Sequence, residues 1–213
     1  MANIKDLINQ ASFKALPTRD RMHIFFRNKL CPFERIEPYV PKEGRILDYG
    51  CGHGLFSWWM KASSPERDVI GYDVCSRKIS LARNLLEKKY GIQFFDNREY
   101  FSSMSFDAVV AVGVLYLIKE KREIISMLKS LIKSEGYIIL KEVVKENSLR
   151  FAWTYFEEVM AAKIFRITEG EGLFFLTKDE ILNILEECGF SVQMQDLSRG
   201  YWYPHMLFIG KKK

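Results

Sequence analysis

Three glycines alternate with other residues directly after a short apolar run that is predicted to be a buried strand. The run Arg45–Tyr49 leads into Asp48-Tyr49-Gly50-Cys51-Gly52-His53-Gly54, and a helical pattern begins at Leu55. Glycine lets the backbone bring its N–H groups close to a ligand, and the amino-terminus of the following helix adds further donors. The loop therefore predicts a place where backbone groups approach a bound molecule closely.

The spacing of these glycines indicates which class of cofactor the loop would bind. In the dinucleotide fingerprint G-x-G-x-x-G/A a third small residue would stand where this chain has Leu55. The observed pattern, D-x-G-x-G-x-G, resembles that of class I S-adenosylmethionine-dependent methyltransferases. The resemblance covers roughly Gly44–Val144 and implies S-adenosylmethionine as the cofactor. A nicotinamide-dependent dehydrogenase is a weaker alternative, against which the glycine spacing argues.

The resemblance also assigns roles to polar residues that follow the next predicted strands. Asp73 stands nineteen residues after Gly54, where a strand-end carboxylate accepts hydrogen bonds from ribose hydroxyls. Asp96 follows the third strand, where the family often has an acidic residue at the adenine amino group, and Asp48 would serve the amino end of the cofactor. Asp48 could instead cap the following turn, Asp73 could be a solvated strand-end residue and Asp96 could cap a loop, while Asp107 is expected to be structural. The cofactor-binding candidates are Asp48, Gly50, Cys51, Gly52, Gly54, Asp73, Val74, Asp96, Asn97 and Val112.

Methyl transfer from a sulfonium requires that the protein position and desolvate the acceptor. A general base is needed only if the acceptor must lose a proton. Tyr116 and Glu142 follow the fourth and fifth predicted strands and are the catalytic candidates. His53 would be a usable base if its ring faced the pocket. Three arginines of the amino-terminal segment, Arg19, Arg21 and Arg27, could reach a carboxylate of the cofactor or the substrate. We expect them instead to lie on a solvated helix face.

Short apolar runs alternate with helical stretches from Arg45 onward, which predicts crossover units and a parallel sheet covered on both faces. The predicted strands are Arg45–Tyr49, Asp68–Tyr72, Ile92–Phe95, Phe106–Val112, Tyr137–Lys141, Phe190–Leu197 and Tyr203–Ile209. The predicted helices are Ile4–Leu16, Thr18–Leu30, Leu55–Ala62, Ser76–Lys89, Lys119–Lys133, Ser148–Ile167 and Thr177–Cys188. Thr18 is expected to be an N-cap, Thr177 and Glu180 a capping box, and Gly189 a helix stop. The last two runs should pair as an antiparallel hairpin.

These elements predict an α/β fold with a Rossmann-like, seven-stranded mixed sheet of five parallel crossover strands plus a terminal antiparallel hairpin, with helices on both faces. We expect one methyltransferase domain, 1–213, made of amino-terminal helices (1–43), a cofactor-binding core (44–144), an aromatic cap (145–176) and a last helix with the hairpin (177–213). The cap is rich in rings that could cover an apolar acceptor or pack onto the sheet. These rings are Phe151, Trp153, Tyr155, Phe156, Phe165, Phe174 and Phe175.

Composition excludes several classes of protein. The longest apolar run, Ala108–Ile118, has eleven residues, whereas a membrane-spanning helix needs about 20. The amino-terminal MANIKDLINQ lacks the apolar stretch of a signal peptide. The four cysteines form no C-x-x-C pair, so neither a disulfide scaffold nor a metal site is expected. We therefore expect a soluble, cytoplasmic protein with reduced thiols.

The net charge of +5 lies mainly in the amino-terminal segment and in the final Lys211–Lys213. This distribution is not the concentrated basic stripe of a dedicated nucleic-acid binder. Enzymes that methylate base amino groups usually carry Asn/Asp-Pro-Pro-Tyr/Phe after the fourth strand, where this chain has Val112-Gly113-Val114-Leu115-Tyr116. We therefore expect a small, apolar or lipid-like acceptor. RNA methylation, cofactor binding without catalysis, contact with a membrane surface and the oligomeric state stay open.

Overall fold

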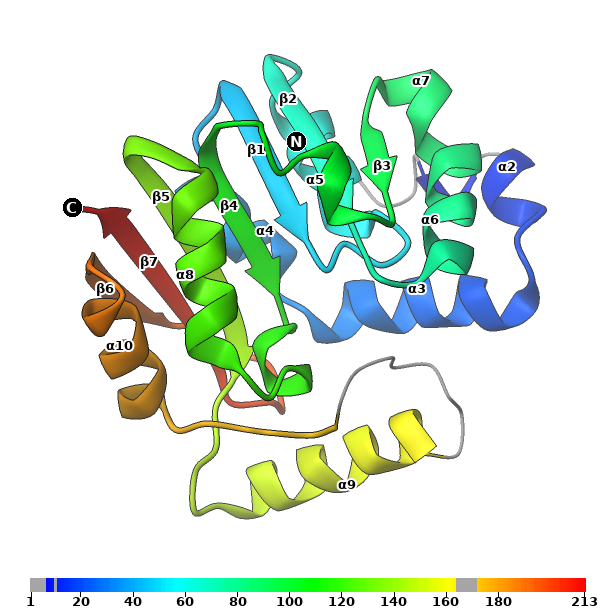
Figure 1. Cartoon of the computed structure of the whole chain (residues 1–213). Coiled ribbons are helices and arrows are strands. Elements are labelled where there is room, and N and C mark those ends of the chain that lie inside the picture. Colours follow the sequence, from blue (N-terminus) through cyan, green and yellow to red (C-terminus); the bar gives the residue numbers. More distant parts are fainter. Residues whose placement is uncertain (1–6, 10, 164–171) are drawn as a thin grey trace. The chain divides into compact units, whose positions relative to one another are not determined.

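Seven strands form a mixed sheet in the order β3-β2-β1-β4-β5-β7-β6 (Figure 1). The computed structural model describes residues 7–9, 11–163 and 172–213. Within them the chain divides into two compact units, Met1–Asp107 and Ala108–Lys213. The predicted seven-stranded, Rossmann-like sheet is confirmed, while the assignment of the whole chain to one domain stays a prediction.

The first unit carries the glycine loop at the carboxyl ends of three parallel strands. Pairing of β1 with β2 places Asp48 beside Gly71 and Tyr49 beside Tyr72, and β2 pairs with β3 in the same direction. Helix α3 crosses at the arrowhead ends of these strands (Figure 1). The elements of this unit are α2 (Ala11–Lys14), α3 (Thr18–Leu30), α4 (Phe33–Ile36), η1 (Glu37–Tyr39), β1 (Gly44–Tyr49), α5 (Leu55–Ser63), β2 (Arg67–Tyr72), α6 (Ser76–Ala82), η2 (Arg83–Glu87), α7 (Lys88–Tyr90), β3 (Gln93–Phe95) and η3 (Arg98–Tyr100).

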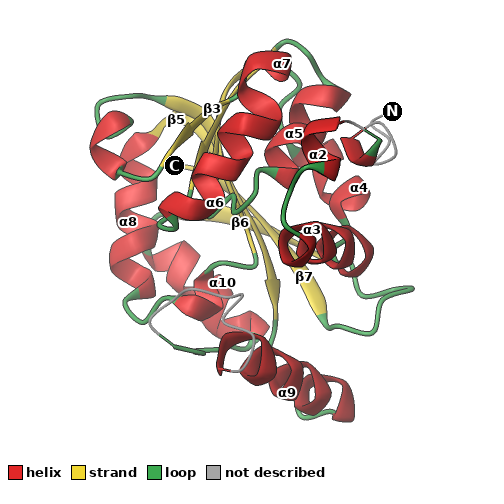
Figure 2. Ribbon diagram, turned by 90° about the vertical axis from the view of Figure 1, so that its right-hand side faces the viewer, coloured by secondary structure: helices red, strands yellow, loops and turns green. Residues whose placement is uncertain are grey.

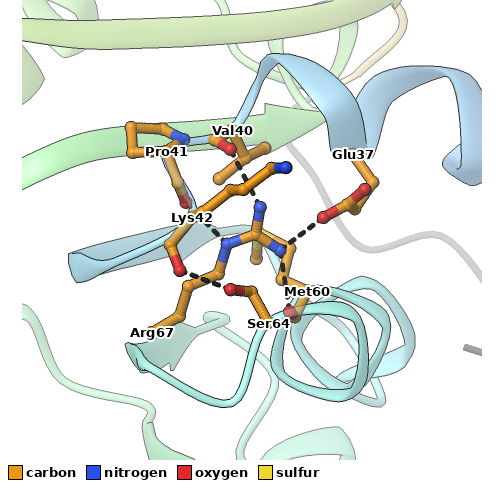
Figure 3. A network of polar contacts seen from close by, with 7 residues as sticks. All are labelled: Glu37, Val40, Pro41, Lys42, Met60, Ser64 and Arg67. Carbon is orange, nitrogen blue, oxygen red and sulfur yellow. Dashed lines mark hydrogen bonds and ion pairs between the residues drawn. The ribbon is translucent and has the colours of Figure 1, made fainter. Parts of the chain in front are cut away.

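A fully buried arginine, Arg67, fastens the connector that precedes β1, residues 32–41 with three prolines, to the rest of the first unit (Figure 3). Arg67 donates to the carbonyl oxygens of Pro41 (2.6 Å), Val40 (2.8 Å) and Met60 (2.8 Å). Its guanidinium also pairs with Glu37 at 2.7 Å. The carbonyl groups of Val40 and Pro41 in this connector are thus satisfied by a side-chain donor. The network fixes the path by which the chain enters β1.

The second unit begins within β4 and contains the antiparallel part of the sheet. Strand β7 pairs with β5 on one side and with β6 on the other. Helices α8 and α10 lie on one face of these strands (Figures 1 and 2), and α9 lies beyond the arrowhead end of β4. The elements are β4 (Phe106–Val112), η4 (Leu115–Leu117), α8 (Lys121–Leu131), β5 (Ile132–Val143), α9 (Leu149–Lys163), α10 (Lys178–Glu187), β6 (Phe190–Asp196) and β7 (His205–Lys212).

Helix boundaries follow the sequence signals at α10 and depart from them at α3. The capping box of Thr177 with Glu180 is formed, and Gly189 has the positive φ of 82° that ends a helix. The expectation that Thr18 is an N-cap is wrong. Pro17 occupies the N-cap position without a side-chain hydrogen bond, and the Thr18 hydroxyl accepts from Arg21 instead.

Several predicted elements differ in extent from the structure. Strand β5 covers Ile132–Val143 where Tyr137–Lys141 was predicted, and β7 covers His205–Lys212 where Tyr203–Ile209 was predicted. The predicted helix Ser76–Lys89 contains a π-helical turn, η2, which side-chain periodicity does not report. Helix α8 ends at Leu131, and β5 starts directly after it. The part of Ile4–Leu16 at residues 4–6 and 10, together with residues 164–171 of the cap, lies outside the described residues, and so does Phe165.

Candidate functional site

The glycine loop is tied to the end of β2 by backbone hydrogen bonds. The N–H groups of Gly50 and Cys51 both donate to the carbonyl oxygen of Tyr72, at 2.7 and 2.9 Å. Gly50, Gly52 and Gly54 have positive φ values of 79°, 57° and 75°, a region that other residues enter at a cost. The loop therefore keeps a defined shape that depends on glycine.

Gly52 and Gly54 differ in what surrounds them. A Cβ built on Gly54 would lie 2.7 Å from the Phe94 ring and 2.8 Å from Leu86, so glycine is required there by packing. A Cβ built on Gly52 would meet no atom of the described residues within 4 Å. The loop is thus closely packed at its end and open at its middle.

Asp73 lies against the open part of the loop. Its Oδ2 accepts a hydrogen bond from the Gly52 N–H at 2.8 Å, and its Oδ1 accepts from the Cys75 N–H at 3.0 Å. The carboxylate is partly exposed, and the neighbouring Val74 side chain is exposed. The structure therefore brings together the loop and the strand-end carboxylate that the sequence predicted as neighbours. Each oxygen of this carboxylate has acceptor capacity beyond the single bond described here.

Asp96 and Asn97 follow β3 and have different local partners. A hydrogen bond from the Ser76 side chain lowers the pKa of Asp96, and Arg83 lies 3.9 Å from its carboxylate. The Asn97 side chain accepts from the Glu99 N–H at 3.0 Å and so caps η3. Asn97 thus has a structural role, while Asp96 stays a candidate for the adenine amino group.

Asp48 is buried beneath the loop, with 2 % of its surface exposed. Burial raises the pKa of Asp48 to about 6, although the Ser57 hydroxyl donates to its Oδ2 at 2.5 Å and opposes the shift. Burial also raises the pKa of the Cys51 thiol well above its usual range, so this thiol is not activated as a nucleophile. An ionisable carboxylate held in this way costs folding free energy, which is more typical of functional sites than of structural ones.

An ion-pair cluster, formed by the buried Asp20 and His53 and the half-exposed Arg77, connects helix α3 to the loop. Asp20 Oδ1 lies 2.8 Å from His53 Nε2, and Arg77 Nη1 lies 2.9 Å from both carboxylate oxygens. Burial acts to raise the pKa of Asp20, but the bonds from His53 and Arg77 outweigh it and leave that pKa lowered. The cluster fastens the amino-terminal helix to the glycine loop.

His53 does not meet the condition for acting as a base. Its ring is only 6 % exposed, and its Nε2 is engaged by Asp20. Burial lowers the pKa of His53, partly offset by Asp20, and lowers the pKa of the adjacent His23 to about 3. The roles of Asp20 and Arg77 were not predicted from the sequence. The available signal was an acidic residue four positions before the buried Ile24, on the inward side of a helix.

In the second unit, Glu142 holds the segment after β4. It is buried, and its Oε1 accepts hydrogen bonds from the N–H groups of Val114 at 2.9 Å and Leu115 at 3.0 Å. Gly113 N–H donates to the Lys141 carbonyl at 2.7 Å, and Val112 is buried at the strand end. The carboxylate therefore shapes the turn that follows β4, directly after the cofactor-binding candidate Val112.

Tyr116 joins this turn to the aromatic cap. Its hydroxyl lies 3.0 Å from Glu158 of α9, and its ring stacks on Phe175 with centroids 4.8 Å apart. Phe151 and Tyr155 complete the aromatic cluster around Phe175. The cap rings therefore serve packing in part. Two others on α9 are exposed, namely Trp153 (52 %) and Phe156 (54 %).

No helix within the described ranges is long and apolar enough to cross a membrane. Among the same residues, no group of three or more His, Cys, Asp or Glu side chains is arranged to hold a metal ion.

Comparisons with known proteins agree with this geometry. A family model described as a methyltransferase domain matches residues 24–195. A demethylmenaquinone methyltransferase of Thermotoga maritima is 22% identical over 179 residues, 78% of this chain and 77% of that protein. A tRNA U34 carboxymethyltransferase of Pseudomonas aeruginosa is 31% identical over 125 residues, 54% of this chain but only 37% of that protein.

The fold is also found among solved structures. Magnesium protoporphyrin IX methyltransferase from Synechocystis, determined with bound SAH, superposes with a TM-score of 0.68 at 20% identity, covering 99% of this chain and 98% of that one. At this identity the likeness concerns the fold alone, whereas the family match spans most of the chain. The chain therefore belongs to the methyltransferase-domain family, and the assignment to S-adenosylmethionine-dependent class I methyltransferases predicted from its glycine loop is confirmed.

Proposed function

We propose that this chain binds S-adenosylmethionine at the glycine loop and, in the cytoplasm, transfers the methyl group to a small apolar or lipid-like acceptor. The observation that carries the cofactor site is the open face of Gly52 beside Asp73. A Cβ would fill free space there, and the Asp73 carboxylate is fixed next to it by the Gly52 N–H. The positive φ of Gly52 accounts for the glycine itself, and the free space beside its backbone and the Asp73 carboxylate is the room that we assign to the cofactor.

The carboxylates around the loop match the ribose, adenine and ammonium groups of S-adenosylmethionine. Asp73 has acceptor capacity for ribose hydroxyls, and Asp96 has a partly exposed carboxylate for the adenine amino group. Asp48, with its pKa raised to about 6, is largely ionised at neutral pH and would attract the ammonium of the methionine part. When bound, S-adenosylmethionine supplies a methyl group on a positively charged sulfur.

The second unit contains a cluster of aromatic rings that suits an apolar acceptor. Tyr116, Phe151, Tyr155 and Phe175 form one aromatic cluster, a lining that suits an apolar molecule. Glu142 and Tyr116 remain the catalytic candidates, but their polar atoms already hold the post-β4 turn and Glu158. The contribution we assign to them is to hold the acceptor-facing backbone in place, because transfer from a sulfonium depends chiefly on orientation and exclusion of water.

Two alanine variants separate cofactor binding from folding. Gly52→Ala should cost only about 1 kcal/mol of stability, from the positive φ, and should weaken the binding of S-adenosylmethionine about tenfold or more in calorimetry. Gly54→Ala should lose about 2–4 kcal/mol of stability, because its methyl group overlaps Phe94 and Leu86. If purified wild-type protein takes up neither S-adenosylmethionine nor its demethylated product, the cofactor site is refuted. Unchanged affinity in the Gly52→Ala variant would move the site away from this glycine.

RNA methylation is the second candidate, and the tRNA-modifying relatives favour it. The chain spans less than half the length of the tRNA relatives reported above, and their substrate is therefore not carried over. Incubation with labelled S-adenosylmethionine and separated lipid, small-molecule and RNA fractions of a cell extract distinguishes the candidates. Label in the lipid or small-molecule fraction supports our proposal, and label confined to RNA overturns the acceptor class. Binding without transfer to any fraction would indicate a non-catalytic protein.

A further inference from the structure

Helix α3 presents an apolar outer face, which we define as Met22, Phe25, Phe26 and Leu30. Their exposed fractions are 53%, 50%, 51% and 41%. The spacing of three, one and four residues places them on one side of the helix. The rings of Phe25 and Phe26 are in edge contact, with centroids 5.9 Å apart. Clustered exposed apolar side chains of this size mark an interaction surface.

The opposite side of α3 is held inward by specific contacts. Ile24 is 2% exposed and Asp20 is 3% exposed. Asp20 is bound by His53 and Arg77 at 2.8 and 2.9 Å. The helix is thus fixed to its unit by one side, so the outer face is presented by an already formed helix.

Basic side chains are exposed near the outer face, and no acidic side chain is exposed among residues 11–30. Arg19 and Lys29 of α3, and Lys14 at the end of the preceding α2, have exposed side chains. Asp20 is the single acidic residue among residues 11–30, and it is turned inward into the ion-pair cluster. Apolar side chains flanked by lysine and arginine complement a surface that has an apolar interior and anionic headgroups.

We infer that α3 docks this protein on the surface of an anionic phospholipid bilayer. Met22, Phe25, Phe26 and Leu30 enter the boundary between headgroups and acyl chains. Lys14, Arg19 and Lys29 contact the phosphates. The inference goes beyond the proposed methyl transfer and does not depend on it, since docking needs neither cofactor nor acceptor.

RNA fits this face less well than lipid does. RNA binding draws its affinity from many phosphate contacts and from aromatic stacking on bases. The outer face offers few cations, and Met22 and Leu30 have no ring to stack. Helix α9 provides a comparison within the chain. It has exposed Trp153 and Phe156, but it carries as many acidic as basic residues, so it lacks the charge that favours anionic lipid.

Sedimentation with vesicles tests the inference on the full-length protein. The vesicles are made of phosphatidylcholine alone or of equal parts of phosphatidylcholine and phosphatidylglycerol. We expect binding to the anionic vesicles, and added salt should weaken it. Phe25→Ser/Phe26→Ser should reduce the affinity about tenfold or more, and Arg19→Gln/Lys29→Gln several-fold. The matched control Trp153→Ser/Phe156→Ser should bind as the wild type does, and circular dichroism checks that each variant is folded.

Several outcomes would overturn the inference. Wild-type protein that stays in the supernatant with anionic vesicles would do so, and so would equal binding to neutral vesicles. Retained binding in both α3 variants would place the contact elsewhere. Loss of a dimer or of RNA binding in Phe25→Ser/Phe26→Ser, without a change in vesicle binding, would assign the outer face to that other partner.

Discussion

Replacing Asp48 by asparagine should make the protein more stable at neutral pH and a poorer binder of its cofactor. The carboxyl group of Asp48 is 2% exposed, and burial raises its pKa from 3.8 to about 6. At pH 7.5 the native state therefore holds a charge that the unfolded chain hydrates more favourably. Asparagine has nearly the same shape and can accept the hydrogen bond that Ser57 donates to Oδ2, but it carries no charge.

The size of the effect follows from the pKa difference. A shift of about two units corresponds to about 3 kcal/mol of destabilisation above pH 6, at about 1.4 kcal/mol per unit. The asparagine amide introduces N–H donors without a partner in the wild-type network, which costs about 1–2 kcal/mol. We therefore expect Asp48→Asn to gain about 1–2 kcal/mol of unfolding free energy at pH 7.5.

The gain should depend on pH in a defined direction. Between about pH 6 and pH 4 the native wild type binds a proton at Asp48 that the unfolded chain does not yet bind. The wild type is stabilised by this proton as the pH falls, whereas the variant has no such group. The advantage of Asp48→Asn should therefore shrink through this window, be lost at about pH 5 and turn into a deficit of about 1–2 kcal/mol near pH 4, where only the cost of the unpaired amide donors is left.

Urea denaturation of both proteins at several pH values measures this difference, and calorimetry at pH 7.5 measures cofactor affinity. Histidine titration affects both proteins alike and cancels in the comparison. A variant that is less stable than wild type at pH 7.5, by an amount that does not change with pH, would refute the assignment of a strained charge to Asp48. Tighter or equal cofactor binding would refute its assignment to the methionine end.

Three further predictions concern packing and titration. Arg67→Met should lower the unfolding free energy by about 3–5 kcal/mol, because buried carbonyl groups and Glu37 lose their partner; the exposed Arg45→Met control should lose at most about 1 kcal/mol in the same urea titration. Tyr116→Phe should lower the unfolding free energy by about 1 kcal/mol, because the hydrogen bond from the hydroxyl to Glu158 is lost. A hundredfold fall in kcat at unchanged stability would show instead that the hydroxyl acts on the acceptor. The contribution of His23 to wild-type stability should fall as the pH drops from about 6.5 toward its lowered pKa of about 3, since the unfolded chain binds the proton first; this is opposite in sign to the contribution of Asp48. His23→Gln should remove about 2–3 kcal/mol of that loss between pH 6.5 and 4, and identical pH profiles for the two proteins would contradict a buried neutral imidazole.

Much of the fold could be predicted because its signals are local. The strand before the glycine loop was expected at Arg45–Tyr49 and lies at Gly44–Tyr49. The capping box at Thr177 depends on residues three apart, so the sequence contains it in full. Thr18 misled the prediction, since a proline before it can take the N-cap position without a side-chain bond. The π-helical turn in Arg83–Glu87 leaves no local pattern that distinguishes it from an α-helix.

The site was predictable only where one motif defines it. Gly52 and Asp73 are paired by a topology that brings neighbouring strand ends together. The contact of Asp20 with His53 joins residues 33 positions apart, and that with Arg77 joins residues 57 apart. Without the path of the chain, no spacing rule connects them. An isolated acid in a basic helix gave no indication of its partner.

The burial of Asp20 affects both sides of α3, the inner side that contacts the glycine loop and the outer face. If Asp20 were exposed, the helix would present a negative charge beside Arg19 and Lys29, and it would lack its hydrogen bond with His53 in the glycine loop. Because the carboxylate is instead buried with His53 and Arg77, the inner side fastens the helix to the cofactor loop and the outer side stays apolar and cationic. Asp20→Asn should therefore loosen α3 and weaken both cofactor binding and vesicle binding. Substitutions in the outer face should weaken vesicle binding alone, and this difference distinguishes a docking surface from a merely loosened helix.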